Sequence, residues 1–225
     1  MTTPIRMTSS QIRKLQRQLN RLGYGPLDVD GVYGPKTKRA HTKATNDRNG
    51  SDRQFQRPRT HVIHATDWPI NSQQDLIAFY GSPGGPQCTA GKVILPFPFK
   101  IAWDLDKSVS RFSCHDKVVQ PMTGIFRDAA AHYGEAEFRR LGLDLFGGCY
   151  NNRAIRGGSR KSTHAWGIAV DLDPARNRLR WGRDRAVFAR PEYEPFWQIV
   201  EAYGATSLGR AANFDWMHFQ FADQI

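Results

Sequence analysis

Two short segments, far apart along the chain, constrain the fold more than any other feature of the sequence. Residues 167–173 alternate between apolar and small or acidic residues, which predicts a strand with Asp171 on a face of small residues. In residues 214–221 the alternation begins at Trp216, so that His218 shares a face with Trp216 and Gln220. If the two strands are neighbours, Asp171 and His218 meet. The sequence therefore predicts a sheet in which these two strands pair.

A third residue completes a possible metal site. His164 lies in the loop that enters the first strand. Two imidazoles and one carboxylate form a ligand set that leaves zinc an open position for water. Asp215 stands at the start of the second strand, where a bend can turn it toward the metal to take a proton from that water. The pattern therefore predicts zinc on His164, Asp171 and His218, with Asp215 as the base of a hydrolase.

The two motifs also resemble those of a known family. The pattern S-x-H-x-x-G-x-A-x-D at residues 162–171, with D-x-x-H at 215–218, is similar to the LAS-type zinc peptidases. Within that family it resembles the branch of VanY-like D-alanyl-D-alanine carboxypeptidases and phage L-alanyl-D-glutamate endopeptidases. The resemblance runs from about Ser72 to the end of the chain. It implies an α+β fold of the LAS and hedgehog-like kind, a small antiparallel sheet with flanking helices that carries one zinc ion per chain.

The resemblance also implies site residues and an activity. Asp215 matches the general base, and Arg153 matches the arginine that binds the substrate and steadies the oxyanion. We expect a peptidoglycan peptidase of the endolysin kind that hydrolyses the stem peptide at the L-alanyl-D-glutamate bond. A D-alanyl-D-alanine carboxypeptidase is one alternative. A non-catalytic wall-binding protein is another, since hedgehog-type relatives keep a zinc site without known hydrolysis, although the carboxylate of Asp215 argues against it.

The N-terminal region carries a second signal. Apolar residues at helical spacing predict a helix over residues 11–24, with Ser9 or Ser10 as its cap. A turn-rich loop follows it. This region resembles, over about residues 8–46, the small three-helix peptidoglycan-binding domain found beside many wall hydrolases. The resemblance ends in a departure, because residues 38–46 are polar where the family has an apolar helix.

The chain is therefore expected to have three parts. These are a peptidoglycan-binding three-helix module at 1–46, a polar linker at 47–71 and the zinc peptidase domain at 72–225. Within the last part, helices are expected over 118–141 and 195–203. The strand at 92–103 contains two prolines, Pro96 and Pro98, which predict a place at the edge of the sheet.

His64 offers a rival metal site. The sequence Val-Ile-His at residues 62–64 faintly resembles the opening strand of zinc N-acetylmuramoyl-L-alanine amidases, in which this histidine is a ligand. The other amidase ligands have no recognisable motif further along the chain. The site of His164, Asp171 and His218 is therefore preferred.

The net charge of +11 is unevenly distributed. Residues 1–60 hold thirteen Lys and Arg against four Asp and Glu, whereas the remainder holds nineteen against seventeen. A basic N-terminal region attracts polyanions, and we expect anionic wall or outer-membrane polymers as partners. Zinc-finger, RNP and helix-turn-helix patterns are missing from the sequence, so no specific nucleic acid partner is expected.

The sequence also bears on where the chain acts. Residues 1–19 contain no apolar segment of the kind found in signal peptides, and no stretch approaches the length of a membrane span. We expect a monomer without a signal peptide, made in the cytoplasm and acting on the cell wall or in the periplasm, as phage endolysins do. Three scattered cysteines predict reduced thiols or at most one disulfide.

Overall fold

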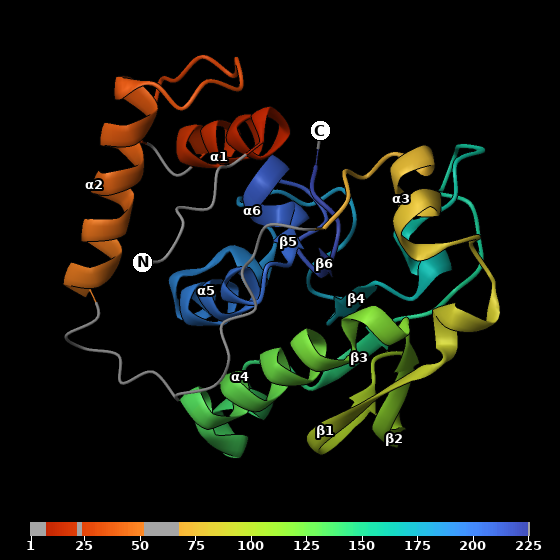
Figure 1. Ribbon diagram of the computed structural model, residues 1–225. Helices are drawn as coiled ribbons and strands as arrows, with labels where there is room; N and C mark the ends of the chain where they lie inside the picture. Colours follow the sequence, from red (N-terminus) through yellow and green to blue (C-terminus); the bar gives the residue numbers. More distant parts are fainter. Residues whose placement is uncertain (1–7, 22–23, 52–67, 225) are drawn as a thin grey trace, which may run out of the picture. The chain divides into compact units, whose positions relative to one another are not determined.

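The computed structural model describes residues 8–21, 24–51 and 68–224 (Figure 1). Its contacts divide the chain into two compact units, Met1–His61 and Val62–Ile225. Among the described residues, no helix combines the length and the apolar character that crossing a membrane requires. His64 lies outside the described residues. The division into parts at 1–46, 47–71 and 72–225 stays a prediction.

The first unit contains two helices in its described part, α1 (Ser9–Arg21) and α2 (Pro35–Ser51). The cap of α1 is Thr8 rather than either of the predicted serines. The Thr8 hydroxyl accepts a hydrogen bond from Gln11 N–H at 3.3 Å, and the Gln11 side chain accepts one from Thr8 N–H at 2.7 Å. This reciprocal pair needs a glutamine three residues after the cap, which only Thr8 has. The helical character of the module is confirmed.

Gln16 connects α1 to the following loop and to α2. Its side chain is 1% exposed. Its amide nitrogen donates to Asp30 Oδ1 at 2.7 Å and to Thr37 Oγ1 at 3.1 Å. Its amide oxygen accepts from Gly31 N–H at 3.0 Å. Because a buried polar group is stable only when it is satisfied, this network explains how a polar α2 packs in a small module.

The second unit is built on one sheet. Its six strands are β1 (Gly91–Ile101), β2 (Asp104–Cys114), β3 (Leu145–Gly148), β4 (Ala169–Leu172), β5 (Thr206–Ser207) and β6 (His218–Gln220). They lie in the order β2-β1-β3-β4-β6-β5. The α+β class is confirmed, but the prediction of an antiparallel sheet is wrong at one place. β3 pairs parallel to β1 because a helix, α4, separates β3 from the β1–β2 hairpin and lets the chain cross back.

The helices of this unit are α3 (Gln73–Tyr80), α4 (Val119–Arg140), α5 (Glu194–Ala202) and α6 (Leu208–Ala212). Both helices predicted from the sequence are confirmed as α4 and α5, to within a residue at each end. α4 runs along the sheet in Figure 1. From it the buried Phe126 ring reaches Phe99 of β1 at 5.3 Å and Phe219 of β6 at 6.2 Å between ring centroids. Packing in the core therefore holds β1 and β6 against α4.

The position of β1 corrects the expectation for Pro96 and Pro98. β1 lies inside the sheet, between β2 and β3. The prolines fall where the β1–β2 register slips, between the pairs Ile94–Arg111 and Phe99–Val109. On the other side, β3 pairs with β1 only at Lys100 and Ile101. The two prolines thus lie where the ladder is interrupted, and no hydrogen bond of the sheet is lost through their missing N–H groups. A bulge inside the sheet therefore accommodates proline as well as an edge position does.

Candidate metal centre

Strands β4 and β6 are neighbours and run antiparallel, which confirms the predicted pairing. In their register Asp171 lies directly opposite His218. Side chains that are directly opposite on adjacent strands point to the same face of the sheet, with Cβ atoms about 5 Å apart. The alternation in the two segments therefore places one carboxylate beside one imidazole.

His164 reaches the same place from a short 3₁₀ helix, Thr163–Trp166, that precedes β4. The Ser162 side chain caps this helix at its start. It ends at Gly167, whose φ of 66° lies in the left-handed region. A Cβ at Gly167 would collide with the carbonyl oxygen of Cys88. Glycine is therefore required both by the backbone conformation and by the close packing that sets the position of His164.

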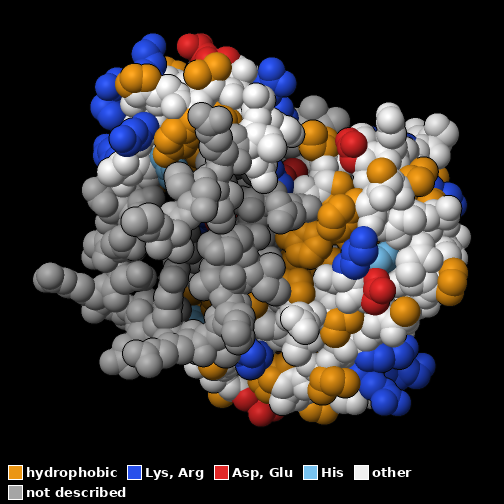
Figure 2. Space-filling model, in the orientation of Figure 1, with side chains coloured by type: hydrophobic (Ala, Val, Ile, Leu, Met, Phe, Trp, Pro, Cys, Tyr) orange, Lys and Arg blue, Asp and Glu red, His pale blue; other side chains and the backbone are white. Residues whose placement is uncertain are grey.

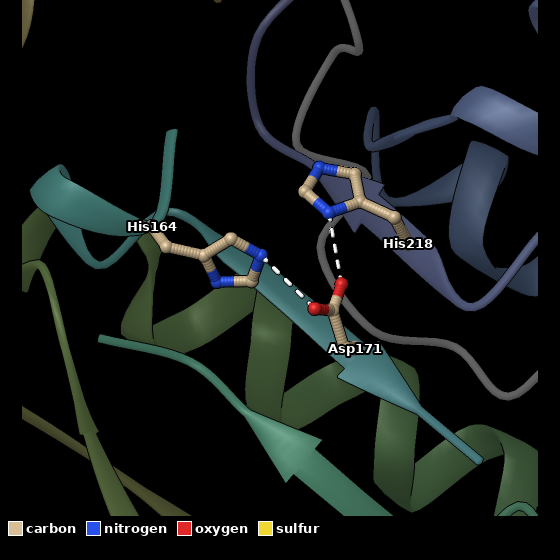
Figure 3. A group of neighbouring side chains, drawn as sticks. All are labelled: His164, Asp171 and His218. Atoms are coloured by element: carbon tan, nitrogen blue, oxygen red, sulfur yellow. Dashed lines mark hydrogen bonds and ion pairs between the residues drawn. The ribbon is translucent and has the colours of Figure 1, made fainter. Parts of the chain in front are cut away.

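The three side chains converge on the Asp171 carboxylate (Figure 3). His218 Nδ1 lies 2.9 Å from Asp171 Oδ1, and His164 Nε2 lies 3.3 Å from Asp171 Oδ2. One donor atom from each residue lies within 4.8 Å of the others. Both imidazoles are buried, while the Asp171 side chain is 19% exposed. The cluster is thus open on the side of its carboxylate.

In each imidazole, the nitrogen that points away from Asp171 has a hydrogen-bond partner of its own. These partners determine which nitrogen carries the proton when the ring is neutral. His164 Nδ1 lies 2.7 Å from the carbonyl oxygen of Cys149, to which only an N–H can donate. His218 Nε2 lies 3.0 Å from Gln220 Oε1. The amide nitrogen of Gln220 donates to Ala222 O, which keeps its oxygen turned toward the ring. In the neutral form, both imidazoles therefore direct a lone pair toward the same carboxylate.

Two lone pairs facing one carboxylate require a cation between them. Burial lowers the pKa of His218, but the hydrogen bond to Asp171 and the charges of Asp171 and Asp215 together outweigh burial, and the pKa is raised overall. Burial raises the pKa of Asp171, and the two histidines reverse this and hold the pKa well below its usual range. A proton on His218 is one such cation. A divalent metal ion is the other, and the donor set of two nitrogens and one oxygen suits zinc.

Asp215 lies beside the cluster on a strained turn. Its φ is 54°, and its N–H donates to the carbonyl of Leu179. It is 8% exposed, and Oδ1 receives no hydrogen bond from any described residue. Burial raises its pKa to about 6, while nearby His218 and Arg153 oppose the rise. A buried carboxylate oxygen with a free lone pair is placed to accept a proton next to the cluster.

Arg153 and Gln220 complete the surroundings. Arg153 lies in the exposed loop after β3, and its guanidinium donates to the carbonyl of Ala154 at 3.2 Å. It lies close enough to Asp215 to lower the pKa of that carboxyl. The contact of Gln220 with His218 was not assigned from the sequence. Its signal was the alternation that puts the two residues on one face of a strand.

Comparison with known families supplies independent evidence. Residues 8–40 match the family described as a putative peptidoglycan binding domain. Residues 156–221 match the family described as D-alanyl-D-alanine carboxypeptidase. No curated protein and no solved structure matches the chain. The second match spans His164, Asp171, Asp215 and His218, and it begins after Arg153.

Both matches are to families whose descriptions concern the bacterial cell wall. The match of residues 8–40 to a putative peptidoglycan binding domain supports peptidoglycan as a partner of the chain. A peptidase domain of the carboxypeptidase type supports a hydrolase that acts on cell-wall peptides. The cluster of His164, Asp171 and His218 lies within this second match and can hold a metal ion.

Proposed function

We propose that the chain is a zinc-dependent peptidase of bacterial peptidoglycan that holds one zinc ion on His164, Asp171 and His218. The observation that carries this proposal is the pair of imidazole lone pairs directed at one carboxylate. When bound, zinc supplies Lewis acidity for the scissile carbonyl and lowers the pKa of water at the site.

The protein's own groups supply the remaining chemistry. Asp215 takes the proton of the attacking water through its unpartnered oxygen and delivers it to the leaving amine. Its raised pKa, near 6, suits a group that must both accept and release a proton near neutral pH. Arg153 donates hydrogen bonds to the carbonyl oxygen as negative charge develops on it.

Two bonds are candidates for cleavage. We favour the L-alanyl-D-glutamate bond, because a wall-binding module suits a polymeric substrate and the two motifs resemble those of phage endopeptidases. The family match at residues 156–221 favours the terminal D-alanyl-D-alanine bond instead. An endolysin-like, monomeric enzyme that is made in the cytoplasm and acts on the wall is part of the first proposal. So is attraction of the basic N-terminal region to anionic wall or outer-membrane polymers.

Mass spectrometry of digested muropeptides tests this function and separates the two bonds. The zinc-loaded protein is expected to release stem peptides that begin at D-glutamate and to leave N-acetylmuramoyl-L-alanine on the glycan. Loss of one terminal alanine would instead identify a carboxypeptidase. A chelator should stop either reaction, and added zinc should restore it. If intact sacculi bind the protein but yield no product with zinc present, the chain is a wall-binding protein without catalysis.

The contact of Gln220 with His218 yields a quantitative prediction. Replacing Gln220 by Leu removes the acceptor that keeps the proton on Nε2, so Nδ1 is no longer reserved for the metal. Loss of such an outer partner costs about 10- to 100-fold in metal affinity. We expect zinc affinity, measured by competition with a chromophoric chelator, to fall within that range. Gln220→Glu, which restores an acceptor oxygen, should recover most of it.

Gln198→Leu provides the matched control. Gln198 lies exposed on α5 and is remote in sequence from the ligands. Its replacement should leave zinc affinity unchanged. Unaltered affinity in Gln220→Leu, with the protein folded, would show that the amide does not position His218.

A further inference from the structure

The second unit carries most of its positive charge in one part of its sequence. Residues 149–190 hold ten Lys and Arg against three Asp and Glu, a net charge of +7. The remainder of residues 61–225 holds nine against fourteen, a net charge of −5. The net charge of +2 for residues 61–225 is therefore the sum of a strongly basic segment and an acidic remainder. In contrast, the expectation from the sequence placed the positive field in the N-terminal region, where Figure 2 also shows many Lys and Arg side chains over α1 and α2.

The first basic segment, residues 151–161, is attached to His164. Asn151 N–H donates to the carbonyl of His164 at 3.0 Å. The segment then turns back on itself, with a bridge between Ala154 and Lys161. It contains four cations and no acidic residue, and Arg156 and Arg160 are exposed. The hydrogen bond to His164 fixes the near end of the segment beside the metal cluster.

The second basic segment, residues 178–185, is attached to Asp215. Asp215 N–H donates to the carbonyl of Leu179 at 3.0 Å, and Arg183 N–H donates to Asn213 Oδ1 at 2.8 Å. The Arg183 guanidinium also lies over the Trp216 ring, 5.7 Å from its centroid. The segment contains four arginines and one aspartate. Two groups of cations are therefore joined to the candidate site, each through a hydrogen bond to the backbone of a site residue.

We infer that these two basic segments form a cationic binding surface that selects stem peptides with free carboxylates. This inference rests on the proposed function. On the C-terminal side of the L-alanyl-D-glutamate bond, the D-glutamate α-carboxylate lies next to the scissile amide, and further carboxylates follow. Neutral amides replace these groups in amidated stem peptides. Opposite charges held by a fixed backbone favour the first kind of peptide over the second, and they do so most at low salt.

The charge separation argues against an ordinary solvated surface. An exposed ion pair contributes about 0–1 kcal/mol, so one arginine would select little. Several cations of one sign around a site act together, because their potentials add and raise the local concentration of an anionic ligand. The acidic residues that would cancel this field lie elsewhere in the unit, where the net charge is −5.

Binding of two matched peptides tests the selectivity of this cationic binding surface separately from catalysis. The probes are N-acetylmuramoyl-L-alanyl-γ-D-glutamyl-L-lysyl-D-alanine and the same peptide with the glutamate α-carboxylate amidated. Zinc-loaded Asp215→Asn protein, which should not cleave them, is titrated with each peptide at low and high salt. We expect the free carboxylate to bind about tenfold more tightly at low salt, a preference that high salt reduces. Arg156→Gln/Arg160→Gln and Arg180→Gln/Arg185→Gln should each reduce the preference.

Lys107→Gln/Arg111→Gln is the matched control. It removes two cations from β2, which β1 and β3 separate from β4, and should leave the preference unchanged. Equal binding of the two peptides, or no binding of either, overturns the inference. So does strong competition by inorganic polyphosphate with no preference between the peptides, which would indicate a general polyanion surface. Cleavage of both peptides at equal rates by the unmodified protein also overturns it, while leaving the proposed peptidase function intact.

Discussion

Replacing His164 by Ala is expected to abolish both zinc binding and peptide hydrolysis. His164 supplies one of the two nitrogen donors, and its ring is fixed by the carbonyl of Cys149 at 2.7 Å. Loss of a mere outer partner costs about 10- to 100-fold in metal affinity, so loss of a ligand should cost more than 100-fold. Zinc content after dialysis against a weak chelator and release of stem peptides from sacculi measure the two effects. Both should fall to background.

His132→Ala is the control for this variant. His132 lies exposed on α4, packed edge-on against Tyr133, and takes no part in the cluster. It should retain zinc and turnover. Circular dichroism of both variants shows whether they fold, since α4 and the sheet do not depend on the imidazole of His164. A folded His164→Ala protein that retains one zinc ion and full turnover would disprove the assignment of the metal centre.

The sequence was sufficient to predict the pairing at the centre of the site. Alternation with a period of two fixes which residues share a face, and a slip by one residue would move Asp171 to the opposite face. Because the second strand obeys the same period, Asp171 and His218 were expected to meet if the two strands were neighbours, and β4 and β6 are neighbours. The helices α4 and α5 were likewise predictable, since their apolar residues recur at helical spacing over long stretches.

Other features depend on partners that a single segment does not specify. Pro96 and Pro98 predict only that a ladder N–H is absent, and a register slip satisfies this inside the sheet as well as an edge does. The parallel pairing of β1 with β3 depends on where α4 delivers the chain. The role of Gln220 depends on Ala222, whose carbonyl orients the amide. The family resemblance pointed to the candidate ligands His164, Asp171 and His218, but it did not point to the groups that orient them.

Replacing Asp215 by Asn is expected to stop hydrolysis while leaving zinc in place. The amide has almost the same shape as the carboxylate but cannot take a proton from water, and general base catalysis contributes about 10²- to 10⁴-fold. We expect turnover to fall by that factor, with zinc affinity little changed. The metal-free variant should be no less stable to heat, because a neutral amide costs less to bury than the carboxylate that it replaces.

The conservative variant Asp215→Glu separates a catalytic carboxylate from a structural one. The family motif accepts either acid at this position, so a longer side chain should retain measurable turnover. Zinc content, melting temperature and the rate of stem-peptide release are compared for Asp, Glu and Asn at this position. If Asn hydrolyses as fast as Asp with zinc bound, the proton must leave water by another route. If Asn loses zinc as well, Asp215 acts in binding the metal, and the division of roles within the site is wrong.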